Sequence, residues 1–262
     1  MALARSERPA PGIARILLDD PAKRNALSAA LRQALSVEIE AALADPAVRA
    51  IVLTGANGAF CAGGDLSSMG TMTAEVARAR MKASHRMLRM LAAAEKPIVA
   101  AIEGPAMGGG AGLALFADAI VMGEGAMIGF PYFKVGLVPD YGLFHTLPRR
   151  VGAGHAARLF NTAAVVKSAE ALAIGLVDRV VPDGEVQAAA LAQAGLLANL
   201  PAAAWAMTKQ QMAQMPTSLE AALEMEALAQ TVAFGSADHA EGRSAFFEKR
   251  KPVFRADDGA ER

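Results

Sequence analysis

Two glycine-rich loops carry the residues of this chain that are best suited to chemistry. The first loop spans residues 58–65 and includes Gly63 and Gly64, and the second spans residues 104–110 and ends in three glycines. Each loop follows a short apolar run of the kind that forms a buried strand. Glycine has no Cβ, so a bound group can approach its main chain closely. If the two strands are neighbours, N–H groups of both loops can converge on one oxygen and form an oxyanion hole.

Other uses of a glycine-rich loop fit less well. The second loop lacks the third glycine of G-x-G-x-x-G, since Leu113 stands there, and it lacks the Lys-Ser/Thr of a phosphate-binding P-loop. Residues 152–157 match G-x-G-x-x-A, but they follow Pro-Arg-Arg and not a strand, so their context is wrong for a dinucleotide site. A tight strand-to-helix turn with close packing is the structural alternative to the oxyanion hole.

Metal, disulfide and serine-hydrolase chemistry are not indicated. The four histidines are scattered without an H-E-x-x-H pattern, and Cys61 is the single cysteine. The sequence contains no G-x-S-x-G motif. We therefore predict no metal and no redox cofactor.

Charge and hydropathy point to a soluble protein. Lys plus Arg and Asp plus Glu each number 26, and this balance does not favour a nucleic-acid partner. The most apolar window, residues 186–207, is interrupted by polar residues and Pro201, so no membrane span is predicted. The N-terminus lacks the apolar core of a signal peptide, and a lone cysteine fits a reducing compartment. A cytoplasmic location is the expectation.

Strands alternating with helices position the two loops. Strands are predicted at residues 12–18, 50–55, 96–102 and 118–122. A helix is predicted after Ser28, as its N-cap, with an end at Asp45-Pro46. Its one apolar face is formed by leucine and isoleucine at every fourth position, namely Leu27, Leu31, Leu35, Ile39 and Leu43. A second helix is predicted over residues 75–94. This alternation predicts an α/β fold with largely parallel strands. Beyond residue 153 the chain is mostly helical. We predict a core at residues 1–200 and a helical region at 201–262 that packs on the core or on another subunit.

The chain resembles the enoyl-CoA hydratase/isomerase (crotonase) family. The resemblance rests on five segments in order along nearly the whole chain, at residues 23–28, 60–66, 108–110, 136–140 and 241–252. It implies a crotonase-like spiral of ββα units with a helical C-terminal trimerisation region, and a homotrimer or a dimer of trimers. It also implies that the chain binds an acyl-CoA substrate and needs no separate cofactor.

The resemblance also implies roles for individual residues. The main-chain N–H groups of Gly64 and Gly109 would hold the thioester oxygen. Coenzyme A would be contacted by a set of residues from the N-terminal half and the tail, namely Lys23, Arg24, Ala62, Leu66, Phe246 and Lys249, of which Phe246 and Lys249 lie in the tail that reaches a neighbouring subunit's site. For the basic residues the alternative is a solvated surface.

The resemblance leaves the reaction open. Hydratases of this family use two glutamates, and Gly112 and Tyr132 occupy those positions here. Neither residue replaces a carboxylate base near neutral pH, because glycine has no side chain and the pKa of tyrosine is near 10. Asp140 matches the acid/base position of several double-bond isomerases in the family, although Asp is also common in turns. One carboxylate suffices to move a proton from C2 to C4.

We therefore predict an enoyl-CoA double-bond isomerase in which Asp140 shuttles the proton. One alternative is a hydratase in which Tyr132 or another carboxylate takes over. The other is a non-catalytic member of the family that binds acyl-CoA. Residues 69–90, rich in Met and Ala, are expected to line the acyl pocket, although Met is also common core filler.

Overall fold

The computed structural model describes residues 2–216 and 218–254. Its main sheet has six strands in the order β1-β2-β3-β4-β6-β9. These strands are β1 Ala4–Ala10, β2 Ile13–Leu18, β3 Ala50–Gly55, β4 Ile98–Ile102, β6 Ala119–Gly123 and β9 Arg179–Val181. β1 runs antiparallel to β2, and every other neighbouring pair in this sheet is parallel. The predicted α/β fold with largely parallel strands is thus confirmed.

A second, smaller sheet has the order β5-β7-β8. Its strands are β5 Pro105–Met107, β7 Met127–Gly129 and β8 Val165–Lys167. The sequence did not predict these strands, because three residues are too few to show an alternating pattern. β1 was also missed, since its sequence ARSERPA is polar and its residues are mostly not buried.

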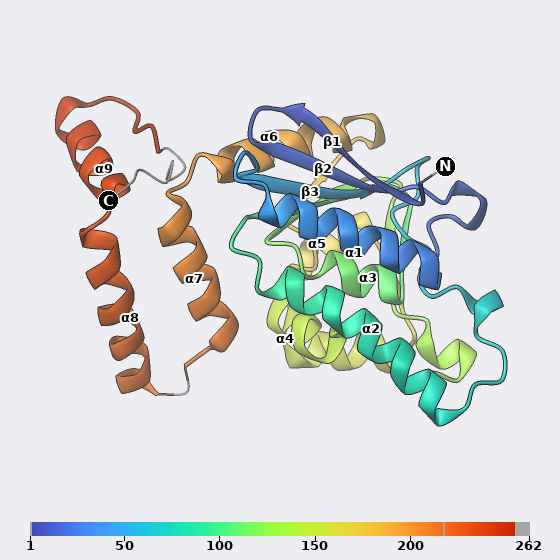
Figure 1. The fold of residues 1–262 in the computed structure, drawn as a ribbon. Helices are drawn as coiled ribbons and strands as arrows, with labels where there is room; N and C mark the ends of the chain where they lie inside the picture. The colour runs from blue at the N-terminus through green and yellow to red at the C-terminus, as the bar shows by residue number, and fades with distance from the viewer. Residues whose placement is uncertain (1, 217, 255–262) are drawn as a thin grey trace.

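Helices cover both faces of the main sheet (Figure 1). They are α1 Ala29–Ala44, α2 Ala74–Ala92, α3 Gly109–Ala114, α4 Leu143–Asn161, α5 Ser168–Ala173 and α6 Val186–Ala198. Along β3, Ile51 and Leu53 belong to one apolar core, and Val52 belongs to a second core packed with α6. This strand is therefore buried on both faces, as predicted.

Local signals in the sequence set the ends of α1. The Ser28 side chain accepts a hydrogen bond from the Leu31 N–H at 3.1 Å, so Ser28 is the N-cap that the sequence predicts. Asp45 is the C-cap, immediately before Pro46. The side chains of Leu31, Leu35 and Ile39 are buried, which confirms the predicted apolar face of this helix.

Three further helices lie to one side of the sheet (Figure 1). They are α7 Ala202–Gln214, α8 Leu219–Phe234 and α9 Ala237–Glu248. The chain bends by 105° between the segments Asp183–Ala198 and Ala202–Gln214, close to Pro201. Large apolar side chains are exposed along these helices, namely Met212, Leu219, Leu223, Leu228, Val232, Phe234, Phe246 and Phe247. The sequence predicts that this region packs on the core or on another subunit, and exposed apolar surfaces of this size are typical of interaction sites.

Within residues 2–216 and 218–254, no single helix is both long and apolar enough to cross a membrane. The α6 and α7 segments reach that length and hydropathy only as a pair, and the pair is sharply bent.

Candidate active site

The two glycine-rich loops lie side by side because their strands are neighbours. β3 and β4 pair in parallel, with Ile51 opposite Ile98. The loops that follow them are joined by main-chain hydrogen bonds, from the Cys61 N–H to the Pro105 oxygen and from the Met107 N–H to the Cys61 oxygen, both at 2.9 Å. The condition that the sequence set for an oxyanion hole is therefore met.

Gly64 and Gly109 line one cavity of about 330 Å³. Among the hydrogen bonds of residues 2–216 and 218–254, neither of their N–H groups donates. The adjacent loop residues are engaged: the Gly63 oxygen accepts from the Leu27 N–H at 2.7 Å, and the Gly108 N–H donates to the Gly129 oxygen at 2.8 Å. The cavity thus contains two unpaired main-chain donors on rigidly held loops, which is what an oxyanion hole needs.

Close packing requires glycine beside these donors. A Cβ on Gly110 would lie 2.5 Å from the Cys61 main-chain oxygen, and Gly63 has a φ of +95°. Some glycines of these loops are therefore needed for close packing or for a positive φ, and others supply the free N–H groups.

Asp140 and Tyr132 form a hydrogen-bonded pair in the same cavity. The Tyr132 hydroxyl donates to Asp140 Oδ1 at 2.7 Å. Burial raises the pKa of Asp140, while the hydrogen bond from Tyr132 and then the charge of Arg80 oppose the rise. Burial, and secondarily the charge of Asp140, raise the pKa of Tyr132 above its ordinary range, so the phenol stays protonated. The pair combines a carboxylate with a fixed donor that orients it, which is an arrangement suited to general acid–base chemistry.

Asp140 is the one acidic residue among the described residues that line the cavity. Gly112 lies in the buried helix α3, and a Cβ added to it would lie 2.4 Å from Tyr141 Cβ and 2.8 Å from the Tyr141 main-chain oxygen. A glutamate at this position would need Tyr141 to move. Tyr132, at the other glutamate position, supplies a phenol bonded to Asp140.

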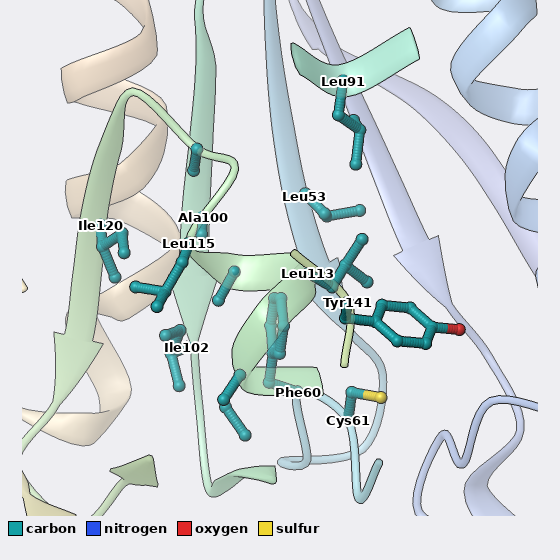
Figure 2. Close-up of a cluster of buried hydrophobic side chains, with 14 of the residues drawn as sticks. Leu53, Phe60, Cys61, Leu91, Ala100, Ile102, Leu113, Leu115, Ile120 and Tyr141 are labelled. Carbon is teal, nitrogen blue, oxygen red and sulfur yellow. The ribbon is translucent and has the colours of Figure 1, made fainter. Parts of the chain in front are cut away.

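Tyr141 is a cavity residue that the sequence did not predict. Its side chain is 5% exposed and lines the cavity beside Gly109. Figure 2 shows its ring near the buried side chains of Cys61 and Leu113. The φ of Tyr141 is +51°, a conformation that a bulky residue adopts at a cost. The only sign of this backbone conformation in the sequence is that a bulky residue stands directly before Gly142.

The part of the cavity lining contributed by residues 69–84 is partly apolar and partly basic. Met69 and Met81 line it, which confirms in part the expectation that residues 69–90 border the pocket, whereas Met87 lies in the core. Arg80 and Ser84 line it as well. The predicted acyl pocket therefore includes polar side chains that the sequence reasoning did not single out.

The four predicted coenzyme A residues in the N-terminal half of the chain fall into two groups. Ala62 and Leu66 line the cavity. Lys23 and Arg24 lie next to the first loop: Lys23 Nζ donates to Asp65 Oδ2 at 2.8 Å, and the Arg24 oxygen accepts from the Ala62 N–H at 3.0 Å.

Asp65 and the two tail residues occupy other places. Asp65 caps the 3-10 turn Leu66–Ser68 through the Ser67 N–H, so it has the structural role that its type suggests. Phe246 belongs to α9 and Lys249 follows it, on the far side of the molecule from the glycine loops (Figure 1). These two residues do not line the cavity of their own chain, and their predicted role requires a second copy.

Over the described ranges, no group of three or more His, Cys, Asp or Glu residues is placed to hold a metal ion. Cys61 is buried, and burial raises the pKa of its thiol to about 12. The G-x-G-x-x-A match at residues 152–157 lies inside α4 and does not follow a strand.

Comparisons with known proteins identify the family to which the chain is similar. A family model described as enoyl-CoA hydratase/isomerase matches residues 8–257. A protein from Thermus thermophilus, named provisionally as an enoyl-CoA hydratase, is 38% identical over 246 residues, covering 92% of this chain and 97% of that protein. The crotonyl-CoA hydratase of Syntrophomonas wolfei is 34% identical over 244 residues, covering 92% and 94%. The crystal structure of an enoyl-CoA hydratase from Bacillus anthracis superposes with a TM-score of 0.92 at 30% identity, covering 97% of this chain and 99% of that one.

Proposed function

The chain belongs to the enoyl-CoA hydratase/isomerase family, and from this membership we propose that it is an enoyl-CoA double-bond isomerase with Asp140 as its base. The family supports the processing of an acyl-CoA thioester. The choice of isomerisation rests on the single carboxylate among the described cavity residues.

The proposed reaction needs one oxyanion hole and one proton carrier. The Gly64 and Gly109 N–H groups donate to the thioester oxygen as negative charge develops on it. The Asp140 carboxylate takes a proton from C2 of a 3-enoyl thioester, and the C2–H electrons enter a conjugated dienolate. The protonated Asp140 then gives that proton to C4, and the double bond comes to lie between C2 and C3. No atom is gained or lost.

Tyr132 supports Asp140 in this scheme. Its hydroxyl donates to one carboxylate oxygen, which leaves the other oxygen to meet the substrate. Burial raises the pKa of Asp140 above that of an exposed aspartate, and a carboxylate with a higher pKa is a stronger base. A protonated Tyr132 keeps the carboxylate in one orientation throughout the proton transfer.

The single observation that carries the proposal is the Asp140–Tyr132 pair in a cavity without a second described acidic side chain. The test is to mix the purified protein with a 3-enoyl-CoA and follow the absorbance of the conjugated 2-enoyl thioester. We expect turnover in the wild type, and a loss of about 100-fold or more in Asp140→Asn, typical of removing a general base. Undiminished turnover in that variant would show that another group is the base.

Hydration is the second candidate, favoured by the names of the relatives, among them the crotonyl-CoA hydratase of Syntrophomonas wolfei. Loss of crotonyl-CoA absorbance at a rate equal to or above that of 3-enoyl isomerisation would favour this candidate. Binding of acyl-CoA thioesters without either reaction would favour the non-catalytic alternative.

We also propose that the chain works as a homotrimer or a dimer of trimers through its C-terminal helices. The exposed apolar side chains of α8 and α9 support this assembly, because contact with another subunit would remove them from water. In such an assembly Phe246 and Lys249 would reach the coenzyme A site of a neighbouring copy. Light scattering coupled to size-exclusion chromatography tests the assembly, and a monomer at micromolar concentration would contradict it.

A further inference from the structure

One wall of the cavity carries more positive charge and more hydrogen-bond donors than an apolar acyl chain can use. Four polar side chains line it: Arg32 from α1, Arg80 and Ser84 from α2, and Tyr141 from the loop before α4. Arg32 lowers the pKa of Arg80, second only to burial, and also acts on the pKa of Tyr141. The two guanidinium groups and the phenol thus line the same cavity and interact electrostatically with one another.

Asp140 acts on Arg80 electrostatically at longer range, but no carboxylate in the described part of the chain contacts either arginine. No ion pair within the described part of the chain includes Arg32 or Arg80. Arg32 is only 8% exposed and donates to the Leu27 main-chain oxygen at 2.7 Å. Arg80 has a 3.4 Å contact with Ser68 Oγ. A buried guanidinium without an anion is costly to keep, so an occupant that supplies one would be favoured.

The Tyr141 hydroxyl is the second independent observation. It is fully buried and makes no hydrogen bond of ordinary geometry among the described residues, and the Ser84 hydroxyl lies near enough to lower its pKa. Ser84, its polar neighbour, donates to the Arg80 main-chain oxygen at 3.3 Å. Tyr141 is also held at a φ of +51°. Strained backbone and unpaired buried polar groups are features of ligand sites.

The charges that face the cavity sum to a positive value. Arg32, Arg80 and the exposed Lys134 carry positive charge, and Asp140 carries the only negative charge among the described lining residues. Even with Asp140 ionised, an excess of positive charge remains.

Resting on the proposed function, we propose that the acyl group of the substrate is short and ends in a carboxylate, held by Arg32, Arg80 and the Tyr141 hydroxyl. Guanidinium groups bind carboxylates through paired, charge-assisted hydrogen bonds, which lend both affinity and orientation. A site built around such donors disfavours the plain alkyl analogue, because its buried polar groups would stay unpaired. The substrate class is thus the monothioester of an unsaturated dicarboxylic acid with coenzyme A.

The test measures binding of unreactive saturated thioesters to the purified protein by calorimetry, so it does not depend on turnover. Succinyl-, glutaryl- and adipyl-CoA are compared with butyryl-, pentanoyl- and hexanoyl-CoA. At one or more chain lengths we expect the carboxylated ester to bind about tenfold or more tightly, the effect of a charged hydrogen bond. Arg80→Met and Tyr141→Phe keep most of the packing. Each should lower the ratio of carboxylated-ester affinity to alkyl-ester affinity by about tenfold, and the affinity for the alkyl ester should stay within about twofold of wild type.

The matched control is Arg78→Met, which removes an exposed arginine of α2 that does not line the cavity and should leave the ratio unchanged. Alkyl esters that bind as tightly as carboxylated ones at all three lengths would overturn this inference and leave the proposed isomerase standing. A ratio unaffected by both Arg80→Met and Tyr141→Phe would overturn it too. If no thioester binds, the proposed function and this inference both fail.

Discussion

Replacing Gly112 by alanine tests whether Tyr141 excludes a side chain from this position. The added Cβ would lie 2.4 Å from Tyr141 Cβ and 2.8 Å from its main-chain oxygen. Ordinary carbon contacts are about 3.5–4.0 Å, and neither neighbouring atom is the free end of a flexible side chain. Overpacking of this kind costs up to about 3 kcal/mol. Alanine in place of glycine in a helix returns about 1 kcal/mol, so the expected net loss is about 2 kcal/mol.

The assay is urea unfolding at fixed protein concentration, with thermal unfolding as a second readout. A loss of about 2 kcal/mol corresponds to a fall in Tm of about 4–8 °C for a chain of this size. The matched control is Gly195→Ala in α6, where a Cβ would meet no atom within 4 Å. That change should stabilise the protein by up to about 1 kcal/mol, from helix propensity alone.

A double-mutant cycle identifies the cause. Tyr141→Gly removes the Cβ that Gly112→Ala would strike and also relieves the φ of +51°. The cost of Gly112→Ala should therefore fall by at least about 1 kcal/mol in the Tyr141→Gly background, since contacting residues are coupled. If Gly112→Ala stabilises the wild type as Gly195→Ala does, Tyr141 moves aside at little cost in free energy, and the steric argument is refuted.

Three further predictions concern the pH dependence of activity and stability and the reactivity of the cysteine. The Tyr132 hydrogen bond lowers the pKa of Asp140, so Tyr132→Phe should raise that pKa and move the acidic limb of kcat/KM for isomerisation to higher pH; a limb that stays in place would contradict the pairing. Hydrogen bonds from Lys23 and then Ser67 lower the pKa of Asp65 to about 2, below its unfolded value of about 3.9. The stability that the Asp65 carboxylate contributes is therefore present above about pH 4 and is lost as the pH falls toward 2. The stability gap between wild type and Asp65→Asn, measured by urea unfolding, should narrow over that range, and a constant gap would count against the ion pair. Cys61 is buried with a pKa raised to about 12, so a thiol reagent at pH 8 should label it slowly in the native protein and rapidly in urea; rapid native labelling would contradict the burial.

Local patterns in the sequence were enough to predict the elements that position the glycine loops. The strand at residues 50–55 is apolar throughout because it is buried on both faces, and the structure places β3 over those residues. Ser28 and Asp45 mark the ends of α1 through hydrogen bonds to nearby main-chain groups. Each of these features is decided by residues close together in the chain, which a single sequence displays.

Features that depend on distant residues were not predicted. The strands β5, β7 and β8 are short, and they exist because they pair with one another across the fold. The resemblance to the family gave the crotonase fold, which the solved structures confirm at a TM-score of 0.92. It gave no indication of Arg32 or Arg80 in the cavity, because both lie on helices whose sequences are typical of ordinary amphipathic surfaces.

Gly112 and Tyr141 show how a structure changes the meaning of a missing residue. In the sequence, Gly112 indicates only that a glutamate is absent. In the structure, the space beside Gly112 is filled by the Cβ and main-chain oxygen of Tyr141, 29 positions later in the chain. A single Gly112→Glu change should therefore not create a hydratase, because the new carboxylate would have to displace Tyr141 before it could orient a water. Since Tyr141 also lies against Gly109, such a displacement would disturb the proposed oxyanion hole as well. Conversion of this site to hydration therefore requires coordinated changes at Gly112 and Tyr141.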